Sequence, residues 1–395
     1  MAGRPRARAI WRGAGALSLG LAVVALAGCH RLYPMPGPAY HVMLYVAGQD
    51  GGIRALNART LRLAPTLAAG GLPVALAYNP ARAELYVLTR TRDGRDAGAL
   101  AVFSIATGGH PALIRVAAQP RALALSGDGA TAYIGGERAG QGRLLAVDLP
   151  SRIVTHRLSL RGLPQAVALA PAERLLVATT QPPRLQVINA ASFRLTASVP
   201  LPAAPTEVIA LPYGHKAFVL CPAANELAVV DLAPPAAALT YLAVGPDPKA
   251  MALKPDGGEL YVSNYGHQGG GASVSIVDTT ANQVEGSLVV GTGPWGLAVS
   301  PDGNQLYVAN HQADTVDVIN LQARHLQAAI PVGLGPERLA LGGYGAYLFV
   351  EDQTSGDIAV IRTDIPALMT LLPSLPGARA LQVAAFRSPA APPRR

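Results

Sequence analysis

Charged and aromatic residues stand at one recurring position of the chain, and they are the residues best suited to bind a ligand. A proline recurs along the sequence, and in several copies a cation follows it directly or one residue later. These cations are Arg121, Lys249 and Arg338, with Arg379 in a last copy where alanine replaces the proline. Trp295 takes the same place in another copy and offers an aromatic face for stacking. Brought together, these side chains would form a polar funnel for a small anionic ligand.

Two acids belong to the same set and leave a second interpretation open. Glu207 and Glu337 follow the recurring proline as the cations do. They could pair with neighbouring cations in salt bridges at a solvated rim, which needs no ligand. Glu207 and Arg338 stand out because alanine or glycine occupies their place in six of the eight copies. The residue types therefore fit both a binding site and an inert rim.

Two histidines raise the question of a metal site. His267 and His311 lie in corresponding segments of neighbouring copies, and Glu351 or Asp352 could supply a further ligand. A metal centre needs at least three ligands in a fixed geometry, which two histidines do not provide. We therefore predict exposed loop histidines and no metal, and we keep His311 as a candidate ligand-binding residue.

Motifs of the common catalytic and cofactor sites are missing from the sequence. It contains no Gly-x-Ser-x-Gly, no phosphate-binding loop with Gly-Lys, and no Cys-x-x-Cys-His for covalent haem. The glycines of Gly266–Gly271 connect two strands and open no helix. The arginines are scattered and only 5% of the residues are aromatic, which argues against nucleic-acid binding. We predict no catalytic residue, no cofactor and no nucleic-acid partner.

The elements that must position the candidate residues are copies of one repeat. Its best copy, Gly291–Asn320, predicts a strand after Pro294, a tight turn at Pro301-Asp302-Gly303, and two more strands rich in β-branched and aromatic residues. An aromatic residue or leucine marks the second strand of each copy at intervals of 41 to 47 residues. These markers are Tyr45, Tyr86, Tyr133, Leu176, Phe218, Tyr261, Tyr307 and Phe349.

This spacing predicts an all-β fold, a β-propeller built from four-stranded blades. The 42 glycines, the 34 prolines and the low charged fraction of 14% suit many short strands joined by tight turns. The first copy begins with a second strand and the last ends with a first strand, so we expect Gly377–Phe386 to pair with Met43–Gly48 and close the ring. We predict eight blades over residues 41–387, with seven as the alternative, and a disordered tail over 388–395.

The best repeats also resemble a known family. Tyr261–Asn264 and Tyr307–Asn310 each follow Pro-Asp-Gly and read YVSN and YVAN. They are similar to the repeats of the YVTN-repeat, YncE-like bacterial β-propellers. The match is strong in these two copies and weak elsewhere, and it implies a fold without one agreed chemistry. In such propellers the first strand of each blade lines the central channel, which implies that the candidate residues lie near the channel mouth.

The N-terminal segment is predicted to direct export. Four arginines precede an apolar run, Ala14–Ala27, that is short for a membrane span and typical of a signal peptide. The run ends in Leu-Ala-Gly-Cys, which resembles the lipobox of bacterial lipoproteins. The resemblance implies cleavage after residue 28 and lipidation of Cys29. An ordinary cleavage and an uncleaved anchor are the alternatives.

The exported chain would then sit in the cell envelope, and we expect the periplasmic face of the outer membrane. Residues 29–40 would form the lipidated N-terminus and a tether. Loss of four arginines and no acid would lower the net charge from +8 to +4. Cys221 would be the other cysteine of the mature chain, and its place after an apolar run indicates a buried, unreactive thiol.

Two functional hypotheses follow. The first is a lipid-anchored, non-enzymatic binding or scaffold protein that takes a protein partner or a small anionic ligand at the channel mouth. The second is a propeller enzyme or cofactor-handling protein, similar at fold level to propeller lactonases or to haem-d1-associated propellers. The sequence does not identify the ligand or the pathway.

Overall fold

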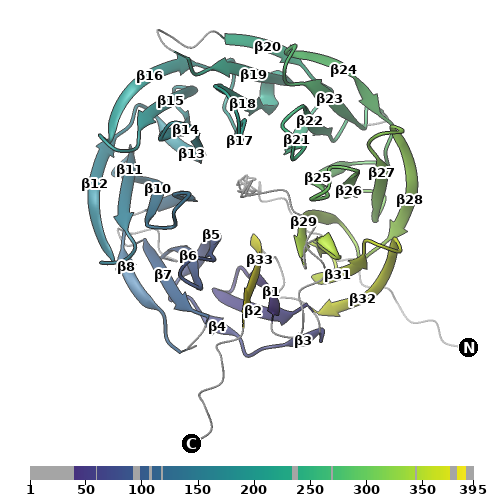
Figure 1. Cartoon of the computed structure of the whole chain (residues 1–395), viewed down its shortest axis with the longest axis horizontal. Helices are drawn as coiled ribbons and strands as arrows, with labels where there is room; N and C mark the ends of the chain where they lie inside the picture. The colour runs from purple at the N-terminus through teal and green to yellow at the C-terminus, as the bar shows by residue number, and fades with distance from the viewer. Residues whose placement is uncertain are drawn as a thin grey trace, which may run out of the picture.

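The chain forms a ring of eight antiparallel β-sheets around a central axis (Figure 1). The computed structural model describes residues 40–58, 60–91, 98–105, 109–116, 119–233, 239–267, 270–342, 345–373 and 380–387. The prediction of a propeller with eight blades is confirmed, and the alternative of seven is wrong. Cys29 and Arg379 lie outside the described residues. Within the described part, no helix is long and apolar enough to cross a membrane.

Strands of four kinds lie between the axis and the outside of each blade. The inner strands are β5 (Leu72–Asn79), β9 (Gln119–Leu125), β13 (Leu163–Ala170), β17 (Glu207–Ala210), β21 (Pro248–Leu253), β25 (Pro294–Val299), β29 (Pro336–Gly342) and β33 (Ala380–Arg387). The second strands are β1 (Tyr40–Ala47), β6 (Glu84–Arg90), β10 (Thr131–Arg138), β14 (Arg174–Thr180), β18 (Lys216–Cys221), β22 (Glu259–Asn264), β26 (Gln305–Asn310) and β30 (Tyr347–Asp352).

The third strands are β2 (Gly52–Asn57), β7 (Ala99–Ser104), β11 (Gln141–Asp148), β15 (Arg184–Asn189), β19 (Glu226–Asp231), β23 (Ser273–Asp278), β27 (Thr315–Asn320) and β31 (Asp357–Arg362). The outer strands are β3 (Arg62–Leu63), β4 (Leu67–Ala68), β8 (Ala112–Arg115), β12 (Ile153–Ser159), β16 (Arg194–Pro200), β20 (Leu239–Ala243), β24 (Gln283–Leu288), β28 (His325–Pro331) and β32 (Ala367–Pro373). A short 3-10 helix, η1 (Pro222–Ala224), follows β18. Blade 1 holds β33 and β1 to β4, blade 2 holds β5 to β8, and each later blade holds the next four strands up to blade 8.

Blade 1 is built from both ends of the described part of the chain. β33 pairs with β1 over eight residue pairs, from Tyr40 opposite Arg387 to Ala47 opposite Ala380. The predicted closure is confirmed, because the last strand supplies the inner strand that the first blade lacks. The outer edge of this blade is thin, since β3 and β4 have two residues each and both pair with β2.

The core is divided into eight apolar clusters, and each cluster packs between two neighbouring blades. The second-strand markers lie in these clusters, and six of them are fully buried: Tyr86, Leu176, Phe218, Tyr261, Tyr307 and Phe349. Inner strands of adjacent blades also contact one another around the axis. Each blade is therefore stabilised mainly by its two neighbours, as expected for a repeat protein.

Polar residues hold the turns between the third and outer strands. The Asp278 carboxylate accepts hydrogen bonds from the backbone of Thr280 at 2.6 Å and of Ala281 at 2.8 Å. Cys221 is buried, as predicted, and burial raises the pKa of its thiol to about 11. The thiol is therefore protonated and unreactive at neutral pH.

Candidate functional site

The ring has two distinct faces, and the candidate residues lie on one of them. Pro248, Pro294 and Pro336, which open inner strands, pair with the last residues of the adjacent second strands. We call this end of the ring the mouth face. The opposite end carries the tight turns from inner to second strands, such as residues 300–304, and we call it the turn face.

The residue after each opening proline stands in a β-bulge. The register between inner and second strands shifts at Pro248/Ala250, at Pro294/Leu297 and at Pro336/Arg338. A bulge leaves an extra residue unpaired and re-aims its side chain. The bulges therefore release three side chains, those of Lys249, Trp295 and Glu337, from the regular alternation between the two faces of a sheet. These side chains meet across neighbouring blades.

A lysine flanked by two aromatic rings forms the centre of the site. The Lys249 Nζ lies 4.9 Å from the ring centroid of Trp295 and 5.0 Å from that of Tyr265. The two rings meet edge to face, with centroids 5.6 Å apart. Asp247 pairs with the same Nζ at 2.8 Å. These contacts hold the ammonium group at one place, because cation–π attraction and an ion pair act on it together.

His311 extends this cluster from blade 7 toward blade 8. Its ring centroid lies 5.4 Å from that of Trp295 and 6.3 Å from that of Tyr265. Burial lowers the pKa of His311, so the imidazole is neutral at pH 7. Its Nδ1 is buried without a hydrogen-bond partner in the described part of the chain, and the nearest carboxylate oxygen, on Glu337, lies 3.9 Å away. Gln312, beside His311, links blade 7 to blade 6 by donating to the Tyr265 hydroxyl at 2.9 Å.

Blade 8 contributes two buried carboxylates and an arginine. Arg338 Nη1 contacts Glu351 Oε2 at 2.8 Å and Glu337 Oε2 at 3.6 Å. The Gln353 side-chain amide faces the Glu337 carboxyl group, and with its nitrogen turned toward that group it would donate to it. Burial raises the pKa of Glu337 and of Glu351, and the charge of Arg338 opposes the shift in both. We call the group of Lys249, Tyr265, Trp295, His311, Glu337 and Arg338 the mouth cluster.

The mouth cluster combines the fixed cation of Lys249, two aromatic rings, the neutral His311, and Glu337, a carboxyl group whose pKa is raised by burial. The Lys249 side chain is 23% exposed and the Glu337 side chain 11%, so the cluster is largely shielded from solvent. Both cations already have acidic partners. A ligand therefore has to match a cation and a hydrogen-bonding carboxyl group side by side, which favours an anion that also carries hydroxyl groups.

The structure brings together only part of the predicted set. Lys249, Trp295, His311 and Arg338 lie in the mouth cluster, as the funnel hypothesis requires. Arg121 instead pairs with Glu137 of its own blade at 3.0 Å. The ion pairs expected at an inert rim are present too, so both interpretations contain part of the observed geometry.

Sequence reasoning missed Tyr265 as a site residue. It directly follows Asn264, just as His311 directly follows Asn310, and both asparagines end second strands. The alignment of these two repeats therefore contained the signal. The prediction of exposed loop histidines is confirmed for His267 and wrong for His311, which is half-buried between blades. No group of three or more His, Cys, Asp or Glu residues suited to a metal occurs in the residues that the structure describes.

Glu207 does not lie at a solvated rim, where the second interpretation of the sequence put it. Its carboxyl group accepts a hydrogen bond at 2.9 Å from the backbone N–H of Met251, in the inner strand of the next blade. Burial raises the pKa of Glu207 to about 8. The prediction of a salt bridge from Glu207 to the rim cations is wrong, because this acid is buried between β17 and β21 and is protonated at neutral pH.

We expect Glu207→Gln to reduce the pH dependence of stability. The folded pKa of about 8 exceeds the reference value of 4.5, so the stability linked to this group is present at low pH and is lost as the pH rises through about 8. Between about pH 6 and pH 7.5 the wild type should lose about 2 kcal/mol through Glu207, at roughly 1.4 kcal/mol per pH unit. Urea denaturation at several pH values measures this slope.

The control for that experiment is Glu173→Gln, which removes an exposed carboxylate. It should keep the wild-type slope. An unchanged slope in Glu207→Gln would show that this carboxyl group is ionised in the folded protein.

Comparisons with known proteins agree with the fold. The family described as "Lactonase, 7-bladed beta-propeller" matches residues 224–331, which run from the end of η1 to the end of β28. No curated protein matches the chain. The Kuenenia stuttgartiensis hydrazine synthase structure is 18% identical, with a TM-score of 0.56, and the match covers 74% of this chain and 96% of that one.

Two further solved structures are similar. A functionally unknown protein from Desulfotomaculum acetoxidans DSM 771 is 16% identical, with a TM-score of 0.58 and coverage of 87% of this chain and 98% of that one. The dihydro-heme d1 dehydrogenase NirN in complex with DHE is 14% identical, with a TM-score of 0.71 and coverage of 90% and 77%. At these identities the likeness shows the fold alone. The eight closed blades and these relatives identify the chain as a β-propeller protein.

Proposed function

We propose that this protein is a non-enzymatic binding propeller that takes a small hydroxylated anion at the mouth cluster. The observation that carries this proposal is the position of Lys249 between the rings of Trp295 and Tyr265, which come from two different blades. The lysine would pair with the anionic group, and the indole would cover an apolar part of the ligand. Glu337 would bind the hydroxyl groups.

The chain contains its own reporter for such a ligand. Of its two tryptophans, Trp11 lies in the predicted signal peptide, so Trp295 is the one tryptophan of the mature chain. Titration with a panel of hydroxy acids and sugar phosphates should change the Trp295 emission. A ligand that binds the folded state should also raise the melting temperature.

Lys249→Met is expected to weaken binding at least about tenfold, which corresponds to about 1.4 kcal/mol. The matched control is Lys254→Met, in the same blade, because Lys254 lies beyond β21 on the turn face and pairs there with Asp256 at 3.4 Å. Calorimetric titration compares the two variants. Equal affinities in Lys249→Met and wild type would contradict the proposal. So would a panel in which no compound changes either the Trp295 emission or the melting temperature.

The lactonase match over residues 224–331 favours a second candidate, hydrolysis of a lactone. Neutral His311 and the Glu337 carboxyl group could then exchange a proton with the attacking water. In that case wild type would open lactones and Glu337→Gln would lose at least about 100-fold in kcat/KM. Such activity would replace the binding proposal. The likeness to NirN carries no cofactor to this chain, because it shows the fold alone.

We also propose that Cys29 is lipidated and holds the protein at the periplasmic face of the outer membrane. The support is the sequence of the predicted signal peptide and its last four residues. A carbonate wash, which strips proteins held only at the membrane surface, should release Cys29→Ala to the soluble fraction, whereas Cys221→Ala, at the buried thiol, should stay in the membrane fraction. A membrane-bound Cys29→Ala protein that detergent alone extracts would refute the lipid anchor.

A further inference from the structure

We propose that the propeller rests on the membrane surface through an apolar patch at the rim of blades 8 and 1. We call it the rim patch, and it comprises Leu63, Ile365, Leu368, Met369 and Leu371. Their exposed fractions are 45%, 61%, 37%, 44% and 43%. Exposed apolar surface of this kind marks a contact with another apolar body.

The outer strand of blade 8 differs from the other outer strands. In β8, β12, β16, β20, β24 and β28, one large apolar side chain each is exposed, whereas β32 exposes three. The segment Ile365–Pro373 contains no charged residue. β32 is also the free edge of its sheet, since it pairs with β31 alone. A long apolar edge is a liability in water, which proteins normally blunt with charges or cover.

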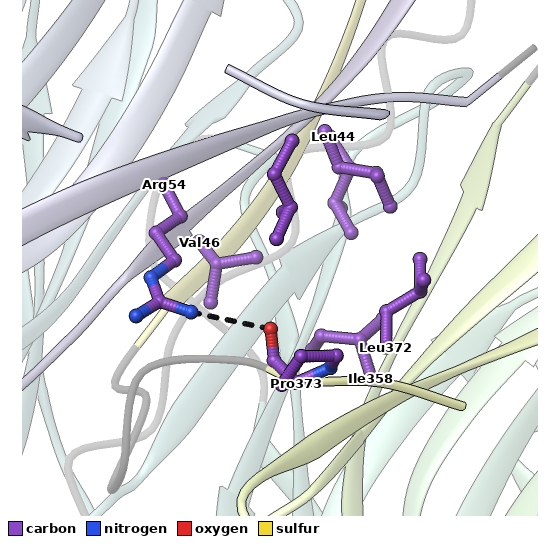
Figure 2. Close-up of a pocket in the computed structure, with 8 residues that line it drawn as sticks. Leu44, Val46, Arg54, Ile358, Leu372 and Pro373 are labelled. Carbon is purple, nitrogen blue, oxygen red and sulfur yellow. Dashed lines mark hydrogen bonds between the residues drawn. The ribbon is translucent and has the colours of Figure 1, made fainter. Parts of the chain in front are cut away.

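Apolar side chains also line the seam between blades 8 and 1, on the other side of β32. Leu372 pairs with Ile358 there, whereas Leu371 pairs with Ala359, which packs toward blade 7. Figure 2 shows a small hollow in this seam, in which Leu44 and Val46 of β1 face Ile358 and Leu372 of blade 8. Leu56 and Leu63 also line it. Arg54 spans the seam and donates to the Pro373 carbonyl at 3.2 Å, as the dashed line in Figure 2 marks. The thin outer edge of blade 1 leaves this seam open to the outside.

The strand register places the rim patch near the point where the N-terminal segment joins the ring. The start of β1 lies beside the end of β2, with Met43 opposite Asn57, and Asn57 pairs with Arg62 of β3. The end of β31 likewise pairs with the starts of β30 and β32. The beginnings of β1, β3 and β32 therefore all belong to the turn face, which carries Ile365 and Leu63 as well.

This arrangement selects a lipid surface as the occupant. From Cys29 to Tyr40 the chain has eleven residue steps, which reach at most about 40 Å when fully extended. A lipid on Cys29 would thus hold the start of β1, on the turn face, within about 40 Å of the bilayer, a step that rests on the lipid anchor proposed above. Exposed Arg62 beside the patch adds attraction to anionic lipids. The mouth cluster, on the other face, would point away from the membrane.

The test separates the rim patch from the lipid anchor. We would use the mature chain, residues 29–395 with Cys29→Ser, which retains every described strand and cannot be lipidated. In a sedimentation assay, this protein should pellet together with vesicles of phosphatidylethanolamine and phosphatidylglycerol. The triple variant Ile365→Ser, Leu368→Ser, Met369→Ser should lose at least about tenfold in vesicle binding.

The matched control changes exposed apolar residues of the mouth face. Val289→Ser with Leu334→Ser removes side chains that are 88% and 53% exposed in the segments before β25 and β29, and vesicle binding should not change. All changed residues are exposed, and thermal melting would verify that each variant folds. Equal binding by the triple variant and wild type, or no binding by wild type, would overturn the proposal.

A fluorescent label provides a second measurement at single positions. Because Cys221 is buried, Met369→Cys in the Cys29→Ser chain can be labelled with an environment-sensitive dye. Vesicles should shift its emission to the blue, and the same dye at Val289→Cys should not respond. A dimer that shifts the label without vesicles would show that a second copy covers the patch, and would also overturn the proposal. None of these outcomes depends on ligand binding at the mouth cluster.

Discussion

A chain that lacks β33 is expected not to form a stable ring. Deleting residues 380–395 removes the inner strand of blade 1 and with it all eight residue pairs between β1 and β33. Leu381 and Val383 would be lost from the cluster that packs Leu44 against Phe349. The loss of a whole inner strand exceeds the marginal stability of a typical domain, about 5–15 kcal/mol. Circular dichroism during heating should show no cooperative transition.

The matched control for this truncation is deletion of residues 388–395, which keeps β33 whole. Its melting temperature should equal that of the full-length protein. A cooperative transition near the wild-type temperature in the longer truncation would show that the ring closes without the pairing of β1 and β33.

Gly296→Ala is expected to destabilise the protein by about 3 kcal/mol, the upper part of the range for overpacking. A Cβ atom on Gly296 would lie 2.2 Å from the backbone oxygen of Glu337, a distance that real Cβ atoms do not reach. The inner strands of blades 7 and 8 would have to separate, because the opposing atom belongs to the backbone and cannot rotate away. Urea denaturation measures the loss of unfolding free energy.

The same change should alter the mouth cluster, because Gly296 follows Trp295 and opposes Glu337. The Trp295 emission should therefore shift in the folded variant. Gly286→Ala, in β24, is the matched control, since a Cβ atom there would meet nothing within 4 Å. Wild-type stability in Gly296→Ala would mean that the two inner strands lie farther apart than the structure shows.

The fold could be predicted from the sequence because the same repeat recurs along the chain, and each copy forms one blade. The second-strand markers keep their spacing and are buried between blades. The position of the truncated first copy and the extra last strand also predicted the closure of blade 1. Arg362 is a local departure from the repeat, because it ends β31 where Asn, Asp or Ser ends the other third strands, and it pairs with Asp364.

The site was only partly predictable, because β-bulges set the directions of its side chains. Sequence spacing placed Arg121 and Lys249 at equivalent positions, but each finds its partners locally. Arg121 meets Glu137 across its own blade, while Lys249 reaches rings that come from blades 6 and 7. The direction of a bulged side chain and the residues of the neighbouring loop decide this, and neither follows from strand alternation.

The pairing of β1 with β33 also has a consequence for the order of events during synthesis. A ribosome makes β1 among the first described residues and β33 as the last, so the first blade waits for its inner strand until almost the whole chain exists. Until then β1 has a free edge that can pair with another chain. Chains that end early would carry this free edge permanently. Incomplete products should therefore be recognised as unfinished by proteases and chaperones, however many blades they already contain.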